Sequence, residues 1–124
     1  MKTILLLVGF VLATYQFGEA QQATKIPQIG YLEGGPRSAH TVRMEAFRQG
    51  LRELGYEEGK NILIEWRFGD AKLDSLPTLA TELVGLKVAV IVTGGGGPTR
   101  AAKETTSTIP IVMAQDNDPV ANGV

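Results

Sequence analysis

The sequence contains no cysteine among its 124 residues, and it has a single histidine, His40. The missing cysteine excludes disulfides, thiolate metal ligands, cysteine nucleophiles and lipid-modified cysteines. No second histidine is available for a metal site, and we expect His40, close to a helix start, to have a capping or surface role. The sequence also lacks an excess of positive or negative charge. A formal net charge of -1 gives no electrostatic reason to expect nucleic acid or an anionic membrane as a partner.

Long apolar runs are absent except at the amino terminus, where one covers residues 4–13. This run follows a lysine and has the length of a signal-peptide core, too short for a membrane span. Small residues at Gly18 and Ala20 fit the recognition positions for cleavage before Gln21. We therefore predict a cleavable signal peptide over residues 1–20, with a retained anchor or a buried strand as the alternatives. An exported chain without cysteine fits the bacterial periplasm.

Strand and helix patterns alternate along the rest of the chain. Alternation with short connections is typical of right-handed βαβ units and a parallel sheet covered by helices. The sequence therefore predicts an α/β fold, a doubly wound, flavodoxin-like parallel sheet with flanking helices. Apolar runs typical of strands lie at residues 29–32, 62–66, 88–93 and 111–114. Apolar residues at helical spacing lie at residues 44–54 and 76–84, and a weaker helix is expected from Thr99 to about Thr106.

Side chains with capping potential mark the ends of these helices. Gly55 can adopt the left-handed conformation that closes the first helix. Ser38 or Thr41 is expected to cap the start of that helix, and Asp74 or Ser75 the start of the next.

A run of four glycines, Gly94–Gly97, directly follows the third predicted strand. Glycine lets the backbone turn sharply and approach a ligand without Cβ clashes. Pro98 and Thr99 suit the first turn of a helix, whose free N–H groups favour anions and other acceptors. Open α/β sheets bind small molecules at the carboxyl ends of their strands. We therefore predict a small-molecule site at this segment, with a flexible connector as the alternative.

Two further loops are expected at the same edge of the sheet. The loop from Glu33 to Ser38 follows the first strand, and a plain turn with a helix cap is its alternative interpretation. Asp116 follows the fourth strand, where its carboxylate can pair with a ligand ammonium group or form an Asx turn. The candidate ligand-binding residues are Gly34, Gly35, Ser38, Thr93, Gly94, Gly95, Thr99 and Asp116.

Several segments together resemble the exported substrate-binding proteins of ABC transporters, in the family that includes tryptophan- and tyrosine-type binding proteins. Their order and spacing along the chain are specific, and they cover nearly all of it after the predicted signal. The segments are residues 29–32, 45–56, 58–67, 76–84, 87–93, 107–114 and 118–120.

The resemblance implies a type 1 periplasmic binding fold, with two α/β lobes joined by hinge strands and a ligand enclosed between them. Members of that family are markedly longer, so we expect residues 21–124 to form only part of the first lobe. The implied function is solute binding, here by one wall of the cleft, with delivery of a small molecule such as an amino acid to a transporter permease. No catalysis, cofactor or metal is implied, nor stable membrane insertion after signal cleavage.

Two alternatives stay open. One is an exported α/β enzyme that acts on a small carboxylated or phosphorylated substrate, with Glu33 and Asp116 as its carboxylates. Against it, no G-x-G-x-x-G follows the first strand and no G-x-S-x-G is present. The other alternative is a truncated product without activity of its own.

Overall fold

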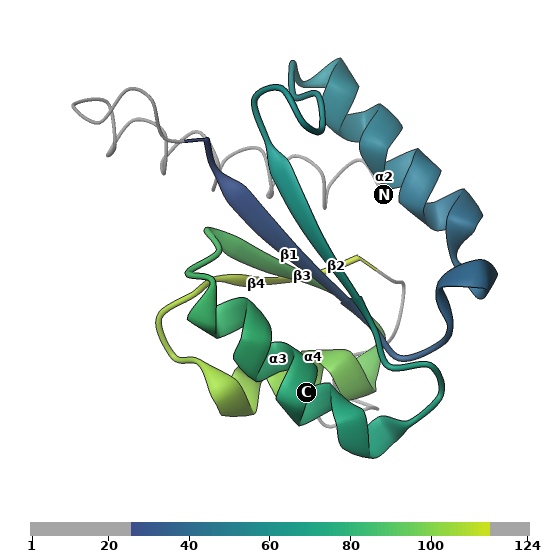
Figure 1. The fold of residues 1–124 in the computed structure, drawn as a ribbon, viewed down its shortest axis with the longest axis vertical. Coiled ribbons are helices and arrows are strands. Elements are labelled where there is room, and N and C mark those ends of the chain that lie inside the picture. Colours follow the sequence, from purple (N-terminus) through teal and green to yellow (C-terminus); the bar gives the residue numbers. More distant parts are fainter. Residues whose placement is uncertain (1–25, 115–124) are drawn as a thin grey trace.

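The computed structural model describes residues 26–114, which form a parallel sheet with helices on both faces (Figure 1). The strands are β1 (Gln28–Glu33), β2 (Leu63–Phe68), β3 (Val90–Gly94) and β4 (Ile111–Met113). The helices are α2 (Thr41–Glu53), α3 (Leu76–Gly85) and α4 (Gly96–Thr105), with 3-10 turns η2 (Arg37–Ala39) and η3 (Leu73–Ser75). The predicted α/β class is confirmed. None of the helices in this part of the chain is long and apolar enough to cross a bilayer.

The strand order is β2-β1-β3-β4, and every neighbouring pair is parallel. This order corresponds to the first four strands of the flavodoxin-like arrangement. Helix α2 lies on one face of the sheet, whereas α3 and α4 lie together on the other (Figure 1). The winding therefore changes direction between β1 and β3, and ligands of such sheets bind beyond the carboxyl ends of the strands at that point.

Each face of the sheet has its own apolar core. Under α2, the ring of Tyr31 lies between Phe47, at a centroid distance of 5.2 Å, and Trp66, at 4.9 Å. Under α3 and α4, the buried residues Leu32 and Ile91 pack with leucine and alanine side chains of the two helices. Burial on both faces explains why the third strand is a continuous apolar run in the sequence.

The ends of the helices differ in part from the sequence prediction. Gly55 has φ 92, so the predicted left-handed helix end is confirmed. Helix α2 instead has His40 at its N-cap position, without a side-chain cap bond, and Ser38 lies exposed in η2. The predicted cap by Ser38 or Thr41 is therefore wrong, because η2 leads directly into α2 through the bond from the His40 N–H to the Arg37 carbonyl.

Helix α3 also lacks a side-chain cap. Ser75 occupies the N-cap position, but its hydroxyl oxygen accepts no bond from a helix N–H, and the hydroxyl donates to the Lys72 carbonyl at 2.6 Å. The Ser75 hydroxyl is thus bonded to the backbone of the preceding loop in place of the helix.

Candidate functional site

The loops that follow β1 and β2 are joined at the carboxyl edge of the sheet by backbone hydrogen bonds. Two residues of the second loop, Asp70 and Ala71, have φ 55 and φ 64, a region that side-chain-bearing residues rarely adopt. Their N–H groups take part in the bonds, which hold this backbone in place. The Gly69 N–H donates to the Glu33 carbonyl at 2.8 Å, Ala71 to Gly34 at 2.8 Å, and Asp70 to Gly35 at 3.2 Å.

The first loop also lies close to the start of α4. A Cβ built on Gly34 would lie 3.9 Å from the Pro98 side chain, which is ordinary van der Waals contact. The loop after β1 therefore lies between the loop after β2 and the first turn of α4, at the point where the winding changes direction.

Glu33 ends β1 with a carboxyl group that is almost fully buried, at 1% exposure. The parallel register places Glu33 beside Gly94 of β3, and a Cβ on Gly94 would overlap the Glu33 carboxylate. Position 94 must therefore be glycine, because any larger residue would displace the Glu33 carboxylate. The Tyr31 hydroxyl shares a hydrogen bond with Glu33, and His40 Nε2 lies 3.7 Å from Glu33 Oε2.

The environment of Tyr31 raises its pKa to about 12. Burial is the largest cause, the negative charge of Glu33 and the hydrogen bond to it act in the same direction, and Arg43 opposes them. The tyrosine is therefore protonated well above physiological pH and donates a hydrogen bond to the buried Glu33 carboxyl group.

His40 turns toward this carboxylate and does not cap α2. Its side chain is 14% exposed, its ring stacks with Phe68 at 6.1 Å, and Nδ1 is buried without a hydrogen bond to the described residues. A Cβ on Gly35 would lie 2.8 Å from His40 Nε2, so Gly35 leaves the space that the imidazole fills. The expected capping or surface role is wrong, because the imidazole makes no cap bond and instead lies between Glu33 and Phe68.

The loop between β3 and α4 is shorter than predicted. Strand β3 extends through Gly94 and α4 begins at Gly96, so Gly95, with φ 107 and ψ 170, is the residue between them. The predicted loop over Gly94–Gly97 and the predicted helix start at Thr99 are therefore wrong. The earlier helix start does not change the expectation that the first turn of α4 has unpaired N–H groups. The side chain of Thr99 stabilises this turn.

Thr93 and Thr99 form a hydrogen-bonded pair inside this turn. Both residues are buried, and their hydroxyl oxygens are 2.7 Å apart. Thr99 donates its proton to the Gly95 carbonyl at 2.7 Å, so Thr93 must donate to Thr99. The two hydroxyls therefore bond within the protein and hold the turn in place. The groups of this turn that remain for a ligand are the first N–H groups of α4.

The structure thus brings part of the predicted candidate set together. The loops after β1 and β3 begin side by side where Glu33 lies beside Gly94, and we call this place the junction of the β1 and β3 loops. Gly34, Gly35, Gly94 and Gly95 lie around it, and Ser38 is exposed in the adjoining η2. Asp116 lies outside the described residues, as does the predicted signal peptide. Ligand contact by this set stays a prediction.

Sequence reasoning missed a cation and a ring at the same edge. The Arg37 guanidinium carbon lies 5.0 Å from the centroid of the Phe68 ring, which also stacks on Trp66 at 6.5 Å with an interplanar angle of 10°. The only signal in the sequence is the alternation that places Trp66 and Phe68 on one face of β2.

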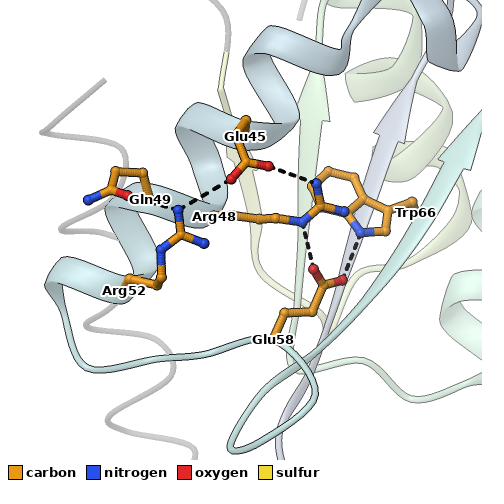
Figure 2. Close-up of polar contacts among 6 residues, drawn as sticks. All are labelled: Glu45, Arg48, Gln49, Arg52, Glu58 and Trp66. Carbon is orange, nitrogen blue, oxygen red and sulfur yellow. Dashed lines mark hydrogen bonds and ion pairs between the residues drawn. The ribbon is translucent and has the colours of Figure 1, made fainter.

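A second group of polar residues lies between α2 and β2 (Figure 2). Glu58 accepts from Arg48 Nε at 2.6 Å and from Trp66 Nε1 at 3.0 Å, and the Arg48 guanidinium lies 4.9 Å from the Trp66 ring. The hydrogen bond to Glu58 is the main cause that raises the pKa of Arg48. Because these groups satisfy one another, the cluster fastens α2 to β2. Within residues 26–114, no cluster of acidic or histidine side chains is arranged to hold a metal ion.

Comparison with known proteins gives the family. Residues 36–124 match the family model described as ABC transporter substrate binding protein. A tyrosine-binding protein of Clostridioides difficile (strain R20291) is 29% identical over 80 residues, which are 64% of this chain and 23% of that protein.

Solved structures share the fold. The ligand-free, open form of a substrate binding protein with adhesive properties from Clostridium difficile has a TM-score of 0.72 and 24% identity, over 79% of this chain and 33% of that one. An ABC domain from Streptococcus pneumoniae in complex with L-Trp has a TM-score of 0.72 and 19% identity, over 80% and 33%. The present chain thus spans 33% of these structures. Since the family model covers more than half of the sequence, the chain belongs to the ABC transporter substrate binding protein family.

Proposed function

We propose that this chain supplies one wall of a solute-binding site in the extracytoplasmic component of an ABC transporter. Family membership supports this role, and the junction of the β1 and β3 loops supports its location. The observation that carries the proposal is the contact between Glu33 and Gly94, which brings the two loops together at the change of winding. A solute there would meet the backbone of Gly34, Gly35 and Gly95 and the first N–H groups of α4.

We propose an amino acid as the solute. The relative from Clostridioides difficile is a tyrosine-binding protein, and the pneumococcal domain that shares the fold was solved with L-Trp. An amino acid carries both charges, and the proposed site has a role for each. The first turn of α4 favours acceptor groups, and Asp116 stays the predicted partner of an ammonium group.

The proposed mechanism is closure of two lobes around the solute, followed by docking of the closed form on the permease. This chain would form part of one lobe, in the periplasm if the predicted signal peptide is used. No bond is made or broken in this process. Its relatives are substrate-binding proteins, and no observation in residues 26–114 favours the enzyme alternative.

Titration calorimetry tests the proposal on the product of the complete open reading frame that contains these 124 residues. We expect saturable binding of at least one of the twenty L-amino acids. A folded product that binds none of them would contradict the proposal. Turnover of a carboxylate or phosphate ester, in place of simple binding, would favour the enzyme alternative.

Two glycine variants locate the site. Gly95→Ala and Gly59→Ala both place a side chain at positive φ, 107 and 90, but only Gly95 lies at the carboxyl edge. Each is expected to cost about 1–2 kcal/mol of stability. Only Gly95→Ala is expected to weaken solute binding, and equal weakening by Gly59→Ala would place the site elsewhere.

A further inference from the structure

One arginine at the carboxyl edge differs from most of the arginines in the rest of the described chain. Arg48, Arg52 and Arg67 each pair with a carboxylate, at 2.6 Å, 3.3 Å and 2.8 Å. Arg37 is exposed in η2 and makes no ion pair with any residue from 26 to 114. Its charge is therefore not balanced by a carboxylate within the described part of the fold.

Arg37 nevertheless has a defined position. Its guanidinium carbon lies over the Phe68 ring at 5.0 Å, so the ring face holds the cation. A guanidinium has five N–H donors in a planar fork, and a cation–π contact with a ring face does not use them as hydrogen bonds to an acceptor oxygen. These donors remain available in the fork geometry that matches a carboxylate.

The ring beneath Arg37 is itself held in place. Phe68 ends β2, and its ring stacks on His40 at 6.1 Å and on Trp66 at 6.5 Å. The backbone hydrogen bonds between the β1 and β2 loops fix the distance between Phe68 and η2. Arg37 is thus a cation held against a fixed ring at the carboxyl edge of the sheet, in the segment that follows the β1 loop.

We propose that Arg37 is a specificity-determining residue of this site and binds the carboxylate of the solute. The inference rests on the proposed function and adds to it that the solute must carry a carboxylate. The exposed acids in the loop and turn after β2, Asp70 and Asp74, make no ion pair with Arg37, and Glu33 is buried beside His40. An external carboxylate is therefore the partner that fits the free edge of this guanidinium.

Calorimetry with matched pairs of probes tests the inference on the complete gene product. L-Tyrosine is compared with tyramine, and L-tryptophan with tryptamine, which lack only the carboxylate. We expect the amino acid to bind and its amine to bind about 10- to 100-fold more weakly, the effect of a hydrogen-bonded charge. Arg37→Ala should weaken amino-acid binding by the same factor and leave amine binding unchanged.

Three further variants separate recognition from folding. Arg37→Lys keeps the charge but loses the planar fork, so it should recover only part of the affinity. Phe68→Leu should weaken amino-acid binding several-fold because the guanidinium loses its support. Arg52→Ala, the same change at the far end of α2, should have no effect.

The outcomes distinguish the two proposals. Equal binding of amino acid and amine, or an Arg37→Ala variant that binds L-tyrosine or L-tryptophan as the native protein does, would overturn this inference and leave the proposed function intact. Failure of the native protein to bind either amino acid would overturn this inference too. If it also bound none of the other amino acids, the proposed function would fail with it.

Discussion

Replacing Gly94 with alanine tests whether the β1 and β3 loops are assembled around the Glu33 carboxylate. The new Cβ would occupy the position of that carboxylate, which is 1% exposed and has no open space to enter. Overpacking of a buried site costs about 1–3 kcal/mol. Displacement also breaks the hydrogen bond with Tyr31, and a lost bond to a charged group costs about 1.5–3 kcal/mol. We therefore expect Gly94→Ala to lower the free energy of unfolding by about 2.5–6 kcal/mol.

The assay is urea denaturation followed by circular dichroism, with two controls. Gly85→Ala makes the same change at the end of α3, where an added Cβ meets nothing within 4 Å, and should be neutral or stabilising by up to about 1 kcal/mol. In a Glu33→Ala background the clash is absent, so Gly94→Ala should cost less than about 1 kcal/mol there. A full cost in that background, or a cost no larger than that of Gly85→Ala, would refute the reasoning.

Two further predictions concern Tyr31 and Glu58. Because the pKa of Tyr31 is raised from 10.0 to about 12, the stability it contributes is complete below pH 10 and is lost between pH 10 and about 12, as the unfolded chain loses its proton first. This loss amounts to roughly 3 kcal/mol, and urea denaturation at pH 9 and 11 should show a fall that Tyr31→Phe reduces; an equal fall in both proteins would contradict the assignment. Glu58→Gln should destabilise by less than about 1 kcal/mol because the ion pair with Arg48 is partly exposed to solvent, yet it should shift the fluorescence of Trp66, the only tryptophan in the sequence. An unchanged emission spectrum would show that the bond from Trp66 to Glu58 is not formed in solution.

The order and type of the elements were predictable because the apolar pattern carries them. The β-branched run from Val88 to Thr93 is typical of a strand buried on both faces of a parallel sheet, and β3 lies there. Its first residues are an exception. Ala89 bonds to β1 through a single N–H to the Gln28 carbonyl, so the regular strand begins at Val90.

Residue-level geometry at the carboxyl edge was not predictable in the same way. Gly96 and Gly97 have poor helix propensity, and their helical conformation depends on Thr99 bonding back to Gly95. The pairing of Arg37 with Phe68 depends on the β1–β2 register, which sets Glu33 opposite Phe68. Local propensity predicts neither feature, because it disfavours a helix at the two glycines and because the contact of Arg37 with Phe68 arises from tertiary packing.

Hydrogen–deuterium exchange with and without L-tyrosine or L-tryptophan tests most directly the claim that this chain forms a wall of a solute site. On the complete gene product, we predict slower exchange in the loops at the carboxyl edge, residues 33–39, 69–72 and 94–99. The loops at the opposite edge, residues 55–61 and 86–89, should exchange as before. Protection of the opposite loops alone, or no change on addition of either amino acid, would contradict the account.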